Sequence, residues 1–368
     1  MPDSNSICVS YEEDLVLIID AVLGAGRIAR EAFNQHDGEI WDKGAGHLVT
    51  ETDIAVNDYL SAVLTKARPN YGWLSEETKD DHSRHACPRT FVVDPIDGTR
   101  AFIDRSPNFV VSVAVVENGR SVVGALYNPV KQELYTATLG GGAQLNRKDI
   151  FATSRKTLEG AHMMGYPRKF RRLGWPDMQI TVSNSMAYRI ALVASGHADA
   201  TVSFTPKSDW DLAAAELIAT EAGAKITNLR GQDFGYDQSG TSEFGVICAG
   251  PALYALLLER VIPIIEKFDN STDRKKDFGF MGTRMTDRNE NDNIQLLHLV
   301  IGGELLDPNK TEFKDLSKVD FVGAYGNYAD ARAAWLGAAQ RTVDNAHMRY
   351  FVLHAHELID PDKDGIIG

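Results

Sequence analysis

The segment Phe91-Val92-Val93-Asp94-Pro95-Ile96-Asp97-Gly98-Thr99, residues 91–99, carries the strongest structural signal in this chain. Its three leading apolar residues predict a short buried strand that ends at Asp94. Pro95 stops regular pairing because it has no N–H group, and Gly98 permits a tight turn. Two carboxylates three residues apart on such a turn repel each other unless a cation lies between them. Carboxylate-rich sites suit magnesium. A solvated acidic turn is the alternative interpretation of the bare motif.

Three further segments place acidic residues beside predicted ends of helices or strands. They are Leu48-Val49-Thr50-Glu51-Thr52-Asp53, Ser75-Glu76-Glu77-Thr78 and Asp209-Trp210-Asp211-Leu212-Ala213-Ala214. The first and third have a simpler interpretation, because an acidic residue at a helix N-terminus caps the helix. Taken singly, none of the three therefore establishes a site.

Hydrophobic periodicity predicts helices alternating with mostly antiparallel strands, which indicates a layered α/β architecture. A turn at Asn118-Gly119 joins two β-rich runs into a hairpin. The helices are expected at 12–33, 53–66, 188–195 and 210–222, and the strands at 91–93, 109–116, 121–127 and 133–138. The chain becomes polar and charged after residue 265, so we expect a domain at 1–265, a linker at 266–292 and a small α/β domain at 293–368.

Composition narrows the range of partners. The chain has 368 residues, 43% hydrophobic and 24% charged, and a formal net charge of −13. A negative surface argues against binding to a nucleic acid polymer or an anionic membrane. We see no membrane span, no signal peptide and, with only three cysteines, no disulfide framework. We therefore expect a cytoplasmic protein.

Together, the four acidic segments resemble the inositol monophosphatase superfamily, which also contains the 3′(2′),5′-bisphosphate nucleotidases. They stand in family order and at family-like spacing over roughly residues 10–265. The resemblance implies an αβαβα sandwich with mixed, largely antiparallel sheets, and a magnesium-dependent phosphomonoesterase that acts on a small phosphorylated metabolite. Relatives are commonly dimers, so a homodimer is expected. One departure is His47, which stands where many relatives have Asp, although Lys43 is retained upstream.

The resemblance also implies the metal ligands. Glu76 and Asp94, with the backbone carbonyl of Ile96, would hold a first magnesium ion, and Asp94, Asp97 and Asp211 a second. Two or three ions per site are expected. A metal-binding regulatory protein without turnover is an alternative, which degraded ligands would favour; none of these ligands is missing.

The catalytic roles carried over from the family fall on neighbouring residues. Thr99 and Asp53 would orient and deprotonate the attacking water, and Glu76 joins them as a catalytic residue. The N–H groups of Gly98 and Thr99 would hold the phosphate. The residues expected to bind substrate are Glu76, Ile96, Asp97, Gly98, Thr99, Lys207 and Asp211.

The leaving group is less clear from the sequence. Inositol monophosphatases usually carry a Glu a few residues before the Trp-Asp pair, and here Phe204 stands at about that place, followed by Lys207. An apolar ring and a cation favour a nucleotide such as 3′-phosphoadenosine 5′-phosphate, with inositol-1-phosphate as the alternative. Equally, Phe204 could belong to the core and Lys207 to the surface. Tyr188 and Arg189 could also reach the site.

Residues from about 293 onward resemble a small uncharacterised domain of bacterial proteins. The resemblance rests on Val300-Ile301-Gly302-Gly303-Glu304, on 331–335 and on 342–346. Strands at 296–301 and 349–354 around a helix at 328–343 suggest a docking or oligomerisation module. We interpret His354 and His356 as exposed histidines rather than a zinc site, and residues 360–365 as a polar tail rather than a calcium loop.

Overall fold

A computed structural model describes residues 9–35, 40–42, 48–167, 170, 174–269, 298–306, 313–325, 328–342 and 347–354. The chain forms two compact units, residues 1–285 and 286–368. Helix α7 (Pro251–Asp269) continues past residue 265, where the larger domain was expected to end. The rest of the predicted linker, residues 270–292, lies outside the described residues.

A seven-stranded sheet lies at the centre of the larger unit, in the order β3-β4-β5-β6-β7-β8-β9. Its strands are β3 (Gly72–Ser75), β4 (Arg89–Asp97), β5 (Val110–Glu117), β6 (Arg120–Asn128), β7 (Glu133–Thr138), β8 (Gly142–Leu145) and β9 (Lys148–Asp149). Strands β3 and β4 pair in parallel, and all other neighbours pair antiparallel. The predicted hairpin is confirmed: β5 and β6 meet at Asn118 and Gly119, whose φ angles are 52° and 77°.

A second sheet of five strands lies beyond a layer of helices, in the order β11-β10-β12-β14-β13. Its strands are β10 (His162–Met164), β11 (Gln179–Thr181), β12 (Ala200–Ser208), β13 (Lys225–Thr227) and β14 (Ser242–Ala249). Strand β10 pairs in parallel with both β11 and β12, whereas the other pairs are antiparallel.

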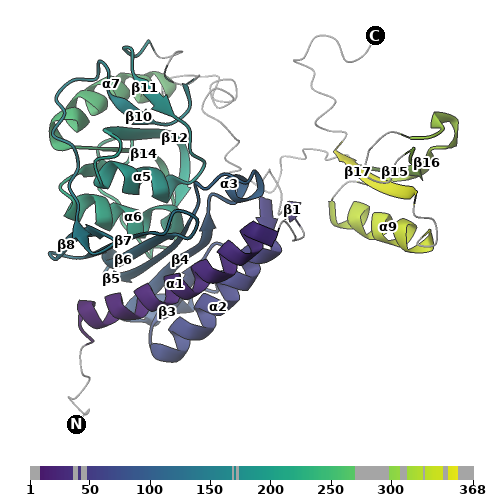
Figure 1. Ribbon diagram of the computed structural model, residues 1–368, viewed down its shortest axis with the longest axis horizontal. Helices are drawn as coiled ribbons and strands as arrows, with labels where there is room; N and C mark the ends of the chain where they lie inside the picture. The colour runs from purple at the N-terminus through teal and green to yellow at the C-terminus, as the bar shows by residue number, and fades with distance from the viewer. Residues whose placement is uncertain are drawn as a thin grey trace. The chain divides into compact units, whose positions relative to one another are not determined.

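Helices form three layers around the two sheets (Figure 1). Helices α1 (Tyr11–Gln35) and α2 (Glu51–Ala67) cover one face of the seven-stranded sheet, and α5 (Met186–Ala194) and α6 (Asp209–Glu221) lie between the sheets. Helix α7 covers the outer face of the second sheet. The predicted αβαβα sandwich with mixed, largely antiparallel sheets is confirmed.

The two faces of the central sheet contribute to separate apolar cores, because side chains alternate along a strand. Phe91 and Val93 of β4 pack toward α1 and α2, whereas Val92 packs toward α5 and α6. A third apolar cluster lies between the second sheet and α7. Four short elements complete the description of the larger unit: β1 (Ile40–Asp42), β2 (Leu48–Thr50), the 3-10 helix η1 (Ser83–Ala86) and α3 (Thr99–Ile103).

The smaller unit is a three-stranded antiparallel sheet with one long helix. Strand β15 (His298–Glu304) lies between β16 (Asp320–Tyr325) and β17 (Met348–His354), a short 3-10 helix η2 (Leu316–Lys318) precedes β16, and α9 (Tyr328–Arg341) packs on the sheet. The small domain of helix and strands is therefore present. The side chains of His354 and His356 and the tail 360–365 lie outside the described residues.

Within the described part of the chain, no helix combines the length and the apolar character that crossing a bilayer requires.

Candidate active site

The carboxylates of Asp94 and Asp97 lie on the same face of β4 because the pairing of this strand with β5 is irregular. Asp94 pairs with Ser112 of β5 but Asp97 pairs with Val110, so three steps along β4 correspond to two along β5. Residues three apart in a regular strand point to opposite faces. The extra residue in β4 restores the alignment, and Ile96 accordingly packs with the α1–α2 core while Val92 packs with the α5–α6 core. Both carboxylates thus point to the side where α5 and α6 begin.

Asp97 is held by the first turn of α5. Its Oδ2 accepts hydrogen bonds from the Ser185 hydroxyl and the Ala187 N–H, both at 2.6 Å, and its Oδ1 accepts one from the Met186 N–H at 3.2 Å. Ser185 also caps α5 by accepting from Tyr188 N–H at 3.0 Å. A carboxylate at a helix N-terminus is stabilised by these unpaired N–H groups. Asp97 is therefore fixed in position with lone pairs to spare for a ligand.

Asp53 and Asp211 both cap the helices that carry them, as their simpler interpretation predicted. The Ser208 N–H donates to Asp211 Oδ2 at 2.7 Å, and the Thr50 N–H and hydroxyl donate to Asp53 Oδ2 at 2.8 and 2.5 Å. The other oxygen of Asp53, Oδ1, accepts from the Thr99 hydroxyl at 3.1 Å. Capping and a place at the site coexist, because each cap uses one carboxylate oxygen and leaves the other available.

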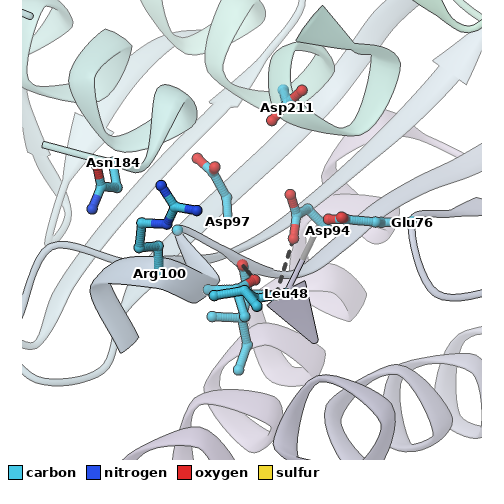
Figure 2. Close-up of a pocket in the computed structure, with 10 residues that line it drawn as sticks. Leu48, Glu76, Asp94, Asp97, Arg100, Asn184 and Asp211 are labelled. Carbon is cyan, nitrogen blue, oxygen red and sulfur yellow. Dashed lines mark hydrogen bonds between the residues drawn. The ribbon is translucent and has the colours of Figure 1, made fainter. Parts of the chain in front are cut away.

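These residues surround a pocket of about 180 Å³. The residues that line it are Leu48, Glu76, Asp94, Ile96, Asp97, Gly98, Thr99, Arg100, Asn184 and Asp211. Figure 2 shows Glu76, Asp94 and Asp211 on one side of Asp97, with Arg100 and Asn184 on the other. Seven of the nine predicted site residues line this pocket. Asp53 lies one hydrogen bond behind Thr99, and Lys207 is not among the lining residues.

The buried carboxylates hold protons more tightly than free ones do. Burial, together with the negative charges of Glu76, Asp97, Asp211 and Asp53, raises the pKa of Asp94 well above its ordinary value. Burial and the Asp211 charge raise the pKa of Asp97 to about 6, although the hydrogen bonds from Ser185 and Ala187 and the charge of Lys207 oppose this. Burial likewise raises the pKa of Asp53 to about 6, against the hydrogen bonds from Thr50.

A divalent cation fits this donor set. One carboxylate oxygen from each of Asp94, Asp97 and Asp211 lies within 4.8 Å of the other two, and the first two residues are buried. Mutual repulsion among such groups is relieved when a cation is bound. All of the available donors are oxygens, with neither thiolate nor imidazole in the group, and hard oxygen donors suit magnesium better than zinc.

Neither Phe204 nor Lys207, the two residues that favoured a nucleotide, is among the residues that line the pocket. The Phe204 side chain is only 2% exposed and packs in the apolar cluster between the second sheet and α7. Of the two interpretations given to Phe204, the structure supports the core. Lys207 is half-buried on β12, opposite Glu243 in the strand pairing with β14. Its charge lies close enough to lower the pKa of Asp97.

Tyr188 and Arg189, both considered as further contacts, also point elsewhere. The Tyr188 hydroxyl donates to Glu133 at 2.8 Å and accepts from the Lys131 ammonium at 2.8 Å. The Arg189 guanidinium donates to the Ser183 carbonyl and lies over the Tyr166 ring, 5.0 Å from its centroid. Neither side chain lines the pocket. Lys43 and His47 lie outside the described residues.

Sequence reasoning missed three lining residues: Leu48, Arg100 and Asn184. Arg100 directly follows Thr99, and Asn184 directly precedes the Ser185 cap of α5, so both are neighbours of recognised positions. Their only signal is this adjacency, since a single polar residue beside a helix start is common for other reasons.

Residues 10–266 match the inositol monophosphatase family. The chain belongs to the inositol monophosphatase family. Members of this family are magnesium-dependent in general, and this chain is a phosphoric monoester hydrolase. Residues 296–355 match DUF4170, a domain of unknown function, which coincides with the smaller unit.

Curated relatives agree with this assignment. An inositol monophosphatase of Dictyostelium discoideum is 35% identical over an alignment of 238 positions, which covers 61% of this chain and 87% of the relative. An inositol-1-monophosphatase of Mesorhizobium japonicum is 32% identical over 59% of this chain and 86% of the relative. The Nus factor SuhB of Escherichia coli K12 is 30% identical over 59% of this chain and 85% of that protein.

Solved structures share the fold of the inositol monophosphatase unit. The extragenic suppressor protein suhB of Bartonella henselae matches with a TM-score of 0.61 and 26% identity, covering 67% of this chain and 98% of that one. A Thermotoga maritima IMPase matches with the same TM-score at 24% identity, covering 69% of this chain and 99% of that one, and supports the fold.

Proposed function

We propose that this phosphatase hydrolyses the phosphate monoester of a small polyol, with inositol-1-phosphate as the reference substrate. The observation that carries this proposal is the pocket lining, which combines a cluster of carboxylates with polar side chains and has no aromatic ring among the described residues. Aromatic side chains are the usual stacking partners of a nucleobase. The two relatives that are 35% and 32% identical are named inositol monophosphatase and inositol-1-monophosphatase, which supports the same substrate.

We assign magnesium to Glu76, Asp94, Asp97, Asp211 and the carbonyl of Ile96. Asp94 carries two oxygens and lies near both Glu76 and the Asp97–Asp211 pair, so it is the residue best placed to serve two ions. When bound, magnesium supplies charge neutralisation for the phosphate and acidifies water. The expected count is two ions, with a third admitted by the family resemblance.

The proton path is assigned to Thr99 and Asp53. The Thr99 hydroxyl donates to Asp53, so its lone pairs are available to accept a hydrogen bond from water. Thr50 fixes Asp53 through its second oxygen, which keeps the carboxylate aimed at Thr99. Removal of a proton from water by a positioned hydroxyl–carboxylate pair of this kind is general base catalysis. The backbone N–H groups of Gly98 and Thr99 are assigned to the phosphate.

A bisphosphate nucleotide such as 3′-phosphoadenosine 5′-phosphate is the second candidate. Phe204 cannot stack on its base, since the Phe204 ring is buried in the core. Arg100 favours the nucleotide, because this exposed side chain lines the pocket beside Asn184 and could hold a second phosphate. Lys207, whose charge acts on Asp97, is the other cation at hand.

The deciding experiment compares kcat/KM for inositol-1-phosphate and 3′-phosphoadenosine 5′-phosphate in one magnesium buffer. We expect the inositol ester to be preferred, EDTA to abolish turnover and magnesium to restore it. Full turnover in EDTA would contradict the metal assignment, and a preference for the nucleotide would select the second candidate. The variant Arg100→Gln sharpens the comparison: a loss confined to the nucleotide assigns Arg100 to a second phosphate, whereas equal losses assign it to the reacting phosphate.

A homodimer and a cytoplasmic location stay predictions. Light scattering on the purified full chain measures the first.

A further inference from the structure

Arg84 is a fully buried cation outside the pocket, with a side chain only 1% exposed. It lies in η1, between β3 and β4. Its Nη2 donates to Asp80 Oδ2 at 2.9 Å and to the Gln238 carbonyl at 2.8 Å, its Nε donates to Asp80 at 3.1 Å, and its Nη1 donates to Asp237. Burying a guanidinium is costly unless its donors are paired, and this one is paired on every nitrogen.

Asp237 continues these contacts toward two other elements. Its Oδ2 accepts from the Thr90 hydroxyl at 2.9 Å, and its own N–H donates to Asp209 Oδ2 at 3.0 Å. The backbone of Asp237 has a φ of 59°, in the left-handed region that residues other than glycine rarely adopt. A backbone held in this conformation indicates that the surrounding contacts determine it.

The three segments joined in this way each carry candidate metal ligands. Asp80 lies four residues after Glu76, and Thr90 lies in β4, which contains Asp94 and ends at Asp97. Asp209 lies two residues before Asp211 in the first turn of α6. Neither Arg84 nor Asp237 lines the pocket.

We propose that Arg84 and Asp237 are positioning residues that hold the loop after β3, strand β4 and the start of α6 in the spacing that metal binding requires. The proposal rests on the proposed magnesium site. The two residues, with Asp80, Asp209 and Thr90, are called the brace below. Direct hydrogen-bond partners of metal ligands typically contribute 10–100-fold to metal affinity, because they fix the ligands before the ion arrives. The brace holds the segments that carry the ligands rather than the ligands themselves, so we expect an effect at the lower end of that range.

The choice of arginine is part of the argument. A planar guanidinium can contact Asp80, Asp237 and the Gln238 carbonyl at once, since its five N–H groups point in fixed directions. A lysine at position 84 would keep the charge but not this geometry. The conservative variant therefore separates the effect of charge from that of positioning.

The test uses the full chain with Arg84→Lys, Asp237→Asn and, as the mildest change, Thr90→Val. Magnesium binding to the metal-free protein is measured by calorimetry and by the rise in Tm that magnesium produces, and kcat and KM are measured at saturating magnesium. We expect the Kd for magnesium to rise roughly tenfold in Arg84→Lys and Asp237→Asn, and less in Thr90→Val. The KM for substrate should change little once magnesium saturates.

Arg89→Lys is the matched control. Arg89 is also buried, at the start of β4, and pairs with Asp14 of α1 and Glu117 of β5. It therefore joins β4 to elements that carry no candidate metal ligand, and not to the loop after β3 or to α6. This variant should lower Tm without changing the Kd for magnesium. The brace is overturned if the Arg84 and Asp237 variants lower Tm as Arg89→Lys does yet bind magnesium like the wild type. A wild-type chain that neither binds nor needs magnesium would overturn the proposed function itself, which is a separate result.

Discussion

At the scale of single residues, the site trades stability for function. Asp94 is 2% exposed and surrounded by four other carboxyl groups, so its charged form is unfavourable in the metal-free protein. For a carboxyl group whose pKa is raised on folding, the native state binds more protons than the unfolded state above pH ~4. Stability of the metal-free protein therefore falls as pH rises through the raised pKa values of Asp94, Asp97 and Asp53, and a bound cation reverses the loss.

Replacing Asp94 by Asn should separate activity from stability. We expect kcat to fall on the order of 10³-fold, since the central metal ligand is lost. The Tm measured in EDTA at pH 8 should rise, because Asn removes a buried charge among like charges. Asp233→Asn, at a side chain that is 82% exposed, should change neither quantity. Retention of most of the activity in Asp94→Asn would refute the role assigned to Asp94.

The Thr99–Asp53 pair predicts an acidic limb in the pH profile. Asp53 can accept a proton only when ionised, and its pKa in the metal-free protein is about 6. Activity should therefore fall as pH falls through about 6, or somewhat lower if bound cations favour the ionised form. The measurement is kcat at saturating magnesium and substrate between pH 5 and 8. Asp53→Asn should lower kcat and remove the limb; the same limb in both proteins would assign it to another group.

At the scale of elements, strand β4 shows where sequence reasoning ends. The strand and turn of residues 91–99 could be predicted from the sequence, as could most helices and the β5–β6 hairpin. Simple alternation would have placed Asp94 and Asp97 on opposite faces, and the irregular pairing with β5 that corrects this depends on a neighbouring strand. Phe204 shows the same limit: it stands at about the place of the family's Glu, but its position in the sequence does not tell which face of β12 its side chain occupies.

The close approach of β6 and α6 gives a prediction about packing. A Cβ atom on Gly124 would lie 3.0 Å from the carbonyl oxygen and 3.1 Å from the Cα of Ala214 in α6. Gly124→Ala should therefore cost roughly 1–3 kcal/mol of unfolding free energy, as overpacking usually does. Because α6 also carries Asp211, magnesium affinity should weaken too.

Gly235→Ala is the control for that substitution, since a Cβ there meets no atom within 4 Å. Chemical denaturation of the two variants measures the difference. Equal stability would mean that α6 can move away from the sheet at little cost.

At the scale of the whole molecule, the inositol monophosphatase unit holds every described residue of the site. The lining residues fall between Leu48 and Asp211, and α7 completes the outermost core before Asp269. The sequence predicted the two-part organisation from the change in composition near residue 265. It offered no activity for the smaller unit, because three strands and a helix are compatible with many functions.

Truncation after Asp269 tests the independence of the larger unit. A unit with its own cores should fold alone and keep kcat/KM within about threefold of the full chain. The comparison uses the Tm and kcat/KM of both proteins in the same buffer. A fragment with an unchanged Tm but little activity would show that residues 270–368 contribute to catalysis.

The irregular pairing of β4 also protects the fold against a register slip. If the strand paired regularly to its end, Asp97 would turn toward Phe109 and Val111 in the α1–α2 core, where a carboxylate would find no partner. Pro95 cannot donate to a regular ladder, and its missing N–H leaves no unpaired donor at the extra residue. The acids that we assign to magnesium thus also carry folding information: a charge tolerated on only one face tells the strand where its regular pairing must end.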